Sequence, residues 1–295
     1  MARRLKATHP LKAAYEELKR EVRNGHYTPG MLILLGRIYA ESLACLNTFE
    51  RVQLISKVPD KAYFAYANHR RTSRAINQDL YRPEYRDWET LRDLLVPGAD
   101  LAGVIDAASV TRTLYSMAIS FCAAIDLLKE GDQKTPGTFF EHFIATFFTW
   151  RVGVEPESSI RILHLDEEGT ELPTDFVFDL GSKQRKFHMP IKTSTRERAV
   201  MLWAHQKLLD GVYGLERFMG TPVLLAETKA DRKRREVVEI CLPAQWKVYQ
   251  LYIARLRRIY YLDLPRPYAR LNEDFPPLVV KPFGEFFFEW STISP

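Results

Sequence analysis

Two residues of opposite charge, Asp175 and Lys192, lie near the ends of two short runs of alternating apolar residues. These runs, Thr174–Leu180 and Lys186–Lys192, are joined by Gly181–Arg185, a pattern that predicts a β-hairpin with a five-residue loop. Because side chains alternate between the two faces of a strand, a carboxylate and an ammonium group can project together from the ends of the paired strands. A carboxylate can hold a metal ion, and a lysine beside it can activate a water that attacks a phosphate.

A predicted helix follows this hairpin and opens with further charged residues. Thr193–Thr195 supply good N-cap side chains, and the helical run extends from Arg196 to Gly211, which is placed as a C-terminal stop. The first turn carries Arg196, Glu197 and Arg198. Two arginines that flank an acid, next to an Asp/Lys pair, indicate a site that brings a polyanion to a metal ion.

The stretch resembles the catalytic core of type II restriction endonucleases of the PD-(D/E)xK superfamily. Residues 173–175 stand for the PD element with one extra residue, and Pro190-Ile191-Lys192 for (D/E)xK, with proline in place of the acid. The group that reads CCGG, CCNGG or related sites looks closest, because it carries an R-(D/E)-R motif shortly after the lysine. The resemblance covers residues 138–213.

This resemblance implies a Mg²⁺ site and assigns roles to individual residues. Mg²⁺ prefers a few carboxylate and carbonyl oxygens plus water, so Asp175, the carbonyl of Ile191 and Glu141 are the expected ligands. Glu141 lies on an apolar face of a predicted helix, where the resembled enzymes often place a further metal-proximal Glu. Lys192 is expected to orient or deprotonate the attacking water. Gln206 occupies the place of the family's downstream Glu and is expected to orient a metal-bound water.

The arginine pair is chemically matched to adjacent C·G pairs. Guanine offers two acceptors to a guanidinium group, and cytosine offers an amino group to a carboxylate. A second cationic stretch, residues 60–86, mixes Tyr and Arg as surfaces that bind phosphates and bases do. The predicted DNA-binding residues are Ser194, Thr195, Arg196, Glu197, Arg198, Arg70 and Arg71.

Each assignment has a plainer structural interpretation. Asp175 could be an acid near a turn, and Asp179 competes with it on the same face. Lys192 could be a solvated strand end, and Glu141 a half-exposed glutamate near a helix start. The charges at 196–198 could be solvated, and residues 60–86 could form a solvated helix with its tyrosines on the core.

Composition permits nucleic-acid binding without demanding it. The chain has 295 residues, 46% of them hydrophobic, with a net charge of +5 and a pI near 9.0. Cys45, Cys122 and Cys241 are far apart and set among apolar residues, which indicates neither a disulfide framework nor a zinc site. Neither His188 nor His205 pairs with a convincing nucleophile, so serine or cysteine hydrolase chemistry is not indicated.

No secretion or membrane signal is expected. The basic residues 1–6 are not followed by an apolar segment, and the most apolar long stretch, 115–128, includes polar residues and is too short to span a bilayer. A cytoplasmic protein is therefore predicted, and the resemblance to restriction endonucleases implies a bacterial or archaeal one.

The patterning predicts an α/β (α+β) fold, with a mixed central sheet, flanking helices and a largely helical N-terminal region. A linker at 130–134 divides the chain into a helical region, 1–130, which would contact DNA or dimerise, and a catalytic core, 131–295. Helices are expected at 10–23, 28–45, 87–96, 100–129, 135–150 and 243–260, and strands at 160–165, 222–227, 236–242 and 286–290.

The leading functional hypothesis is a Mg²⁺-dependent endonuclease that cuts double-stranded DNA at a short palindrome rich in C·G pairs. A homodimer, or a larger homo-oligomer, would match the twofold symmetry of such a site. Two alternatives stay open: a non-catalytic DNA-binding protein, favoured by the missing acid at Pro190, and an RNA-processing nuclease with the same core.

Overall fold

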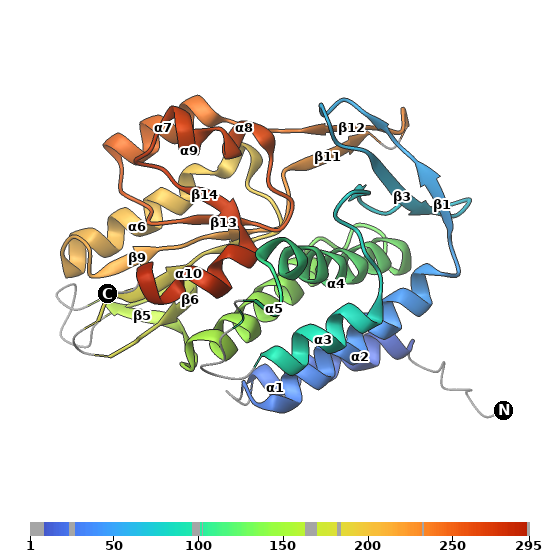
Figure 1. The fold of residues 1–295 in the computed structure, drawn as a ribbon, viewed down its shortest axis with the longest axis horizontal. Helices are drawn as coiled ribbons and strands as arrows, with labels where there is room; N and C mark the ends of the chain where they lie inside the picture. The colour runs from blue at the N-terminus through green and yellow to red at the C-terminus, as the bar shows by residue number, and fades with distance from the viewer. Residues whose placement is uncertain are drawn as a thin grey trace.

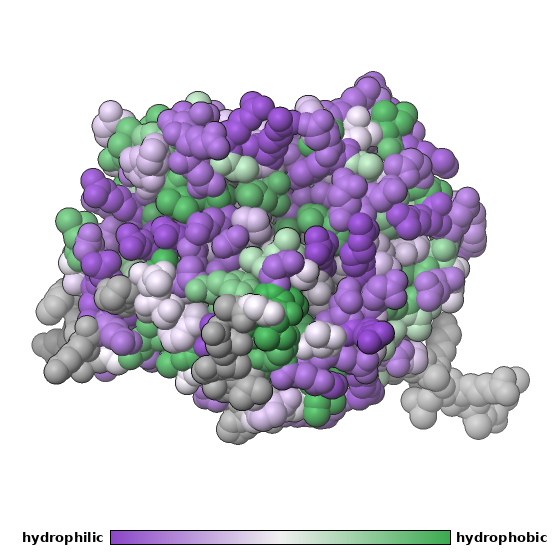
Figure 2. Space-filling view, in the orientation of Figure 1, coloured by the Kyte–Doolittle hydropathy of each residue, from purple (hydrophilic) through white to green (hydrophobic). Residues whose placement is uncertain are grey.

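The computed structural model describes residues 9–23, 27–95, 101, 103–162, 170–181, 184–231 and 233–293. Helices from the N-terminal half pack beside two four-stranded sheets, and shorter helices cover the far side of those sheets (Figure 1). Polar residues dominate the face seen in Figure 2, with apolar patches between them.

The N-terminal helices form as the apolar periodicity predicts. In the first of them Leu11, Ala14, Tyr15 and Leu18 recur at helical spacing and are buried. These helices are α1 (Pro10–Arg23), α2 (Pro29–Leu46), α3 (Tyr85–Leu94), α4 (Ala107–Leu128) and α5 (Lys134–Val152). By length and composition, α2 and α4 could each cross a membrane, but 83% of the apolar window of α4 is buried inside the protein, as in a core helix.

The predicted hairpin is confirmed, and two sheets meet at it. One has the order β5 (Pro156–Ile162), β6 (Thr170–Phe178), β7 (Lys186–Met189), β9 (Phe218–Gly220), and in it Phe176 pairs with Met189 and Phe178 with Phe187. The other is parallel, with the order β14 (Val280–Pro282), β13 (Ile259–Tyr261), β10 (Val223–Leu224), β8 (Ile191–Lys192).

Pro190 marks the point where the chain passes from one sheet to the other. Proline has no N–H to donate to a ladder, so the run predicted as one strand divides there. β7 pairs with β9 on one side of Pro190, and β8 pairs with β10 on the other. The consequence is that Lys192 lies at the end of a strand in the parallel sheet, while Asp175 lies in the mixed sheet β5-β6-β7-β9.

The interpretation of residues 60–86 as a helix is wrong. The segment contains β3 (Tyr63–Ala67) and β4 (Ile76–Asn77), and β3 lies between β1 (Glu50–Gln53) and β4 in an antiparallel sheet. Its aromatic residues favour strands, and burial of Tyr63, Phe64 and Ala65 on both faces hides the alternation. A second three-stranded sheet joins β2 (Ile55–Ser56) to the hairpin β11 (Thr228–Asp231) and β12 (Glu236–Glu239).

The C-terminal predictions need correction as well. The helix α7 (Pro243–Tyr252) ends well before residue 260, and the buried Ile259–Tyr261 is strand β13. Residues 286–290, predicted as a strand, belong to α10 (Phe286–Ile293), because a short, wholly apolar run has no period that separates strand from helix. Two short helices, α8 (Arg266–Ala269) and α9 (Leu271–Asp274), lie between.

The largest cluster of buried side chains contains residues from both sides of position 130, among them Leu35, Leu114, Phe148 and Phe286. The division into regions 1–130 and 131–295 stays a prediction.

We predict that Gly284→Ala destabilises the protein by about 3 kcal/mol or more. A Cβ at this position would lie 1.9 Å from the carbonyl oxygen of Ala107 and 2.6 Å from Oγ1 of Thr111. Gly211 is the control, because it is exposed within α6 (Val200–Tyr213) with nothing near its Cβ position, and alanine there should stabilise by up to about 1 kcal/mol. Urea unfolding of both variants measures this, and equal midpoints would contradict the predicted packing of Gly284.

Candidate active site

Asp175 and Lys192 lie together, as the hairpin predicts. Oδ2 of Asp175 is 2.5 Å from Nζ of Lys192 and also accepts the backbone N–H of Ile191 at 2.7 Å. The Lys192 side chain is 45% exposed and that of Asp175 is 21% exposed, so the pair opens to solvent. Asp179, the competing acid, instead pairs with Lys186 at 2.5 Å, which lowers the pKa of Asp179.

The direction of strand β8 presents Ile191 to the same site. The carbonyls of Pro190 and Lys192 accept from Val223 N at 2.9 Å and Leu225 N at 3.1 Å, so both face β10. Backbone groups of successive residues in a strand point to opposite sides, so the N–H and C=O of Ile191 face away from β10, toward Asp175. The carbonyl of Ile191, which the sequence predicts as a metal ligand, therefore points to the side where Asp175 lies.

Glu141 reaches the pair from helix α5, which contacts β8. Its Oε1 lies 3.8 Å from Nζ of Lys192. Burial and the nearby carboxylate of Asp175 raise the pKa of Glu141 to about 7, and Lys192 acts against this rise. Three predicted residues from separate elements therefore converge on one place.

The oxygens gathered here suit a hard cation. Asp175 and Glu141 offer carboxylate oxygens and Ile191 a carbonyl, the ligand types that Mg²⁺ accepts while keeping several waters. No group of three or more His, Cys, Asp or Glu side chains that could hold a metal ion occurs among the described residues.

Gln206 is buried and its amide is engaged in another network. Nε2 donates to Oδ1 of Asp210 at 2.8 Å and to the carbonyl of Phe218 at 2.9 Å, while Oε1 lies 3.4 Å from Nδ1 of His188. The other ring nitrogen of His188 lies 3.1 Å from Oγ1 of Thr174, next to Asp175 in the chain. Gln206 thus faces His188, and no hydrogen bond in the described part of the chain joins it to Asp175 or Lys192.

The Arg-Glu-Arg segment is a 3₁₀ turn, η1 (Arg196–Arg198), and not the first turn of an α-helix as predicted. Arg196 has φ of +44°, which an α-helix excludes, and α6 starts only at Val200. The helix also runs past Gly211 to Tyr213, where Gly214 with φ of +90° ends it.

The residues of this turn differ in exposure. Glu197 and Arg198 are exposed, whereas Arg196 is half-buried and its Nη2 donates to the carbonyl of Thr228 at 3.0 Å. Ser194 is half-buried. Thr195, predicted to contact DNA, is buried, so it lies behind the exposed edge of the turn.

Glu227 is the residue that sequence reasoning missed. It ends the predicted strand 222–227, is fully buried, and accepts hydrogen bonds from Thr195 and Arg196. An acid at the end of an otherwise apolar run was the only available signal.

Arg70 and Arg71 lie in the turn between β3 and β4, away from η1 in the sequence. Oδ1 of Asn68 accepts both of their backbone N–H groups at 2.8 Å. The Arg70 side chain is exposed, and Nη1 of Arg71 donates to the carbonyl of Leu127 at 2.8 Å. Within the described residues, no hydrogen bond or ion pair joins these arginines to Asp175 or Lys192.

A cavity of about 690 Å³ lies between α1 and the start of α5 and is rich in cations. Its charged lining residues are Lys12, Glu16, Lys19, Arg23, Lys129, Asp132 and Lys134. Thr138 and His142, which lie on the same helix as Glu141, also line it. Sequence reasoning did not find this basic surface, because its cations are dispersed over two distant segments.

We predict that the stability of the metal-free protein falls as pH rises from about 4.5 to about 7, through Glu141. The folded state keeps this proton up to about pH 7, but the unfolded chain releases it near 4.5, so a higher pH favours unfolding. Glu141→Gln removes the titration. In EDTA its unfolding free energy should therefore rise relative to wild type by about 1–2 kcal/mol between these pH values. A difference that stays constant with pH would contradict the shifted pKa.

Comparison with known proteins gives one informative match. No family model matches the chain, and no curated protein matches its sequence. The crystal structure of the type IIP restriction endonuclease Kpn2I is similar, with a TM-score of 0.80, 22% sequence identity and coverage of 97% of both chains. The likeness therefore extends far beyond residues 138–213, and it confirms the predicted mixed α/β, restriction-endonuclease-like fold.

Proposed function

We propose that this protein is a type II restriction endonuclease, which hydrolyses phosphodiester bonds of double-stranded DNA at a specific short sequence. The observation that carries the proposal is the convergence of Asp175, Lys192 and Glu141 where β6, β8 and α5 meet. The fold shared with a type IIP restriction endonuclease supports it. Such an enzyme would act on DNA in the cytoplasm of a bacterium or archaeon.

The chemistry assigned to the site is metal-assisted hydrolysis. Asp175, the Ile191 carbonyl and Glu141 would hold Mg²⁺, which would stabilise negative charge on the phosphate and lower the pKa of a bound water. Lys192 is exposed enough to touch a phosphate, and its ammonium group would orient the attacking water and offset the charge of the transition state. Asp175 positions that ammonium group through their 2.5 Å contact.

Sequence recognition is assigned to the exposed side of η1. A forked guanidinium from Arg198 matches guanine O6 and N7, and the carboxylate of Glu197 matches the amino group of cytosine. The expected target is a short palindrome rich in C·G pairs, read by a homodimer or larger homo-oligomer. The cations of the cavity beside α5 would contact phosphates next to the cut site.

A second candidate is a non-catalytic, sequence-specific DNA-binding protein. Pro190 replaces the acid of the (D/E)xK motif, and the amide of Gln206 is bound to Asp210 and Phe218. Incubating the protein with plasmid and either Mg²⁺ or EDTA separates the two. The endonuclease gives discrete fragments only with Mg²⁺, and the binding protein gives none.

We predict that Asp175→Ala and Lys192→Ala abolish cleavage while sequence-specific binding stays measurable in Ca²⁺ or without metal. These side chains are assigned to metal binding and water activation, which docking does not need. Single-turnover cleavage and gel shifts measure the two properties.

The matched control for these variants is Asp179→Ala. This acid lies on the same strand as Asp175 but pairs with Lys186, so its loss should leave cleavage near the wild-type rate. If Asp175→Ala cuts as fast as Asp179→Ala, the assignment of the site is wrong.

We predict that Arg198→Ala weakens binding to the cognate duplex about 10-fold or more and barely changes binding to a scrambled duplex. One bidentate contact to guanine is worth roughly 1–3 kcal/mol of discrimination. Arg234 is the control, since it is exposed in the β11–β12 hairpin and should affect both duplexes alike, through phosphate neutralisation. Competition gel shifts at fixed salt measure both affinities. If Arg198→Ala weakens binding to both duplexes equally, Arg198 contacts a phosphate and does not read a base.

A further inference from the structure

The backbone of strand β10 continues past its end alongside the segment that follows Lys192. Leu225 N donates to the carbonyl of Lys192 at 3.1 Å, and Ala226 N donates to that of Thr193 at 3.2 Å. The next residue, Glu227, therefore reaches the level of Thr195. One continuous stretch of backbone thus places Glu227 in register with the lysine of the site.

The carboxylate of Glu227 gathers donors from both sides. Its Oε1 accepts the hydroxyl groups of Thr195 at 2.6 Å and Tyr261 at 2.9 Å, and its Oε2 accepts the backbone N–H of Thr195 at 3.0 Å and that of Arg196 at 2.8 Å. Glu227 is 0% exposed, and it forms no ion pair within the described residues. A buried carboxylate is costly unless it is hydrogen-bonded, so these four donors define how it must lie.

These hydrogen bonds act on the backbone where the turn η1 begins. Arg196 has φ of +44°, a conformation that residues other than glycine rarely adopt. Glu227 binds the amide of Arg196 itself and that of the residue before it, and the carbonyl of Thr228 accepts the Arg196 guanidinium at 3.0 Å. The path of the turn is thereby fixed from inside the protein, and its exposed residues, Glu197 and Arg198, point outward.

We propose that Glu227 is a positioning residue for sequence recognition, whose carboxylate holds the turn 195–198 so that Glu197 and Arg198 meet DNA in register with Lys192. The inference rests on the proposed function, since it assumes that this turn reads bases. Glu227 itself would not touch DNA, because it is buried beneath the turn.

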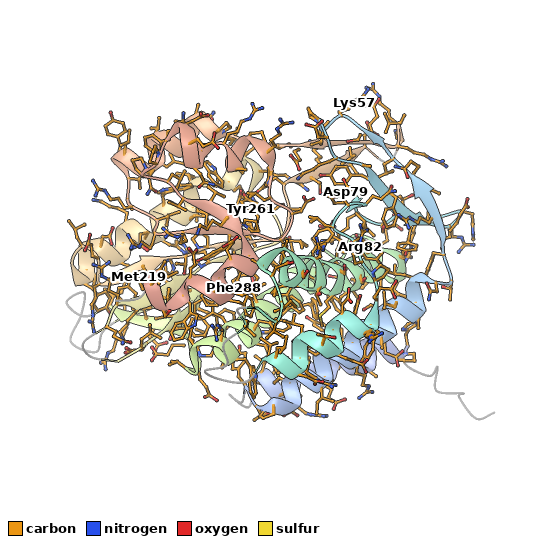
Figure 3. All side chains as sticks on the ribbon, in the orientation of Figure 1. Lys57, Asp79, Arg82, Met219, Tyr261 and Phe288 are labelled. Atoms are coloured by element: carbon orange, nitrogen blue, oxygen red, sulfur yellow. The ribbon has the colours of Figure 1, made fainter. Side chains whose placement is uncertain are left out.

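We call the hydrogen bonds that Glu227 accepts from Thr195, Arg196 and Tyr261 the clamp. A second carboxylate bound to a tyrosine of strand β13 supplies a matched control for Glu227 and for Tyr261. Tyr261, labelled in Figure 3, donates to Glu227, whereas its neighbour Tyr260 donates to Glu289 at 2.8 Å. Both tyrosines are fully buried in β13, and Glu289 also pairs with Arg258 and Lys281, away from the turn. Glu289→Gln and Tyr260→Phe therefore perturb another carboxylate that binds a tyrosine of the same strand, 14% exposed and ion-paired, without touching 195–198.

The test compares Glu227→Gln with Glu289→Gln, and Tyr261→Phe with Tyr260→Phe. An amide at 227 presents an NH₂ group where one carboxylate oxygen accepted, so at least one donor of the turn loses its acceptor. The measurements are metal-free binding to the cognate duplex, defined from the fragment ends that wild type produces, binding to a scrambled duplex, and melting temperature.

We expect Glu227→Gln to lower the cognate-to-scrambled affinity ratio roughly 10-fold, with scrambled binding changed less than about 2-fold. Tyr261→Phe should lower the ratio less, by about 2- to 5-fold, because three donors to Glu227 remain. The two control variants should lower the melting temperature but leave the ratio at its wild-type value.

Several outcomes would overturn the proposal. If Glu227→Gln folds and keeps the wild-type cognate-to-scrambled affinity ratio, Glu227 has no role in recognition. The same conclusion follows if Glu289→Gln lowers that ratio as much as Glu227→Gln does. If Glu227→Gln does not fold, Tyr261→Phe decides, and an unchanged ratio there counts against the clamp. If the wild-type protein binds both duplexes equally, the proposed function and the clamp are both wrong. If Glu227→Gln and Tyr261→Phe both keep the wild-type preference for the cognate duplex, only the clamp is wrong.

Discussion

One carboxylate oxygen connects the two main sheets of this protein. Asp175 lies on β6 in the mixed sheet, yet its Oδ2 binds the backbone of Ile191 and the side chain of Lys192 on β8 in the parallel sheet. The chain changes sheets at Pro190, which cannot continue the ladder. Because Asp175 bridges this break, the position of Lys192, and of the turn beyond it, depends on the same contact.

Around that contact, two carboxylates share one ammonium group. Lys192 lies between Asp175 and Glu141; burial first, and then the carboxylate of Asp175, raise the pKa of Glu141 to about 7 against the opposing effect of Lys192. A site with this surplus of negative charge suits a divalent cation, in keeping with the hydrolysis proposed for it.

The sequence predicted best what depends on local pattern. The alternation of apolar residues predicted the hairpin and the proximity of Asp175 to Lys192. The helical spacing of apolar residues predicted which side chains between Leu11 and Leu18 are buried in α1. The break at Pro190 and the 3₁₀ turn at 196–198 were missed, because both depend on pairing with the distant β10 and on Glu227. Tyr63–Ala67 and Phe286–Ile293 were misassigned since burial on all sides removes the period that separates strand from helix.

The most direct test of the account is to digest a sequenced phage genome with the purified protein and Mg²⁺ and to sequence the fragment ends. The account predicts that the ends share one short palindromic sequence rich in C·G pairs, and that EDTA abolishes cutting. Uncut DNA, or ends without a common sequence, would contradict the claim that the Asp175–Lys192–Glu141 site cleaves DNA at a specific sequence.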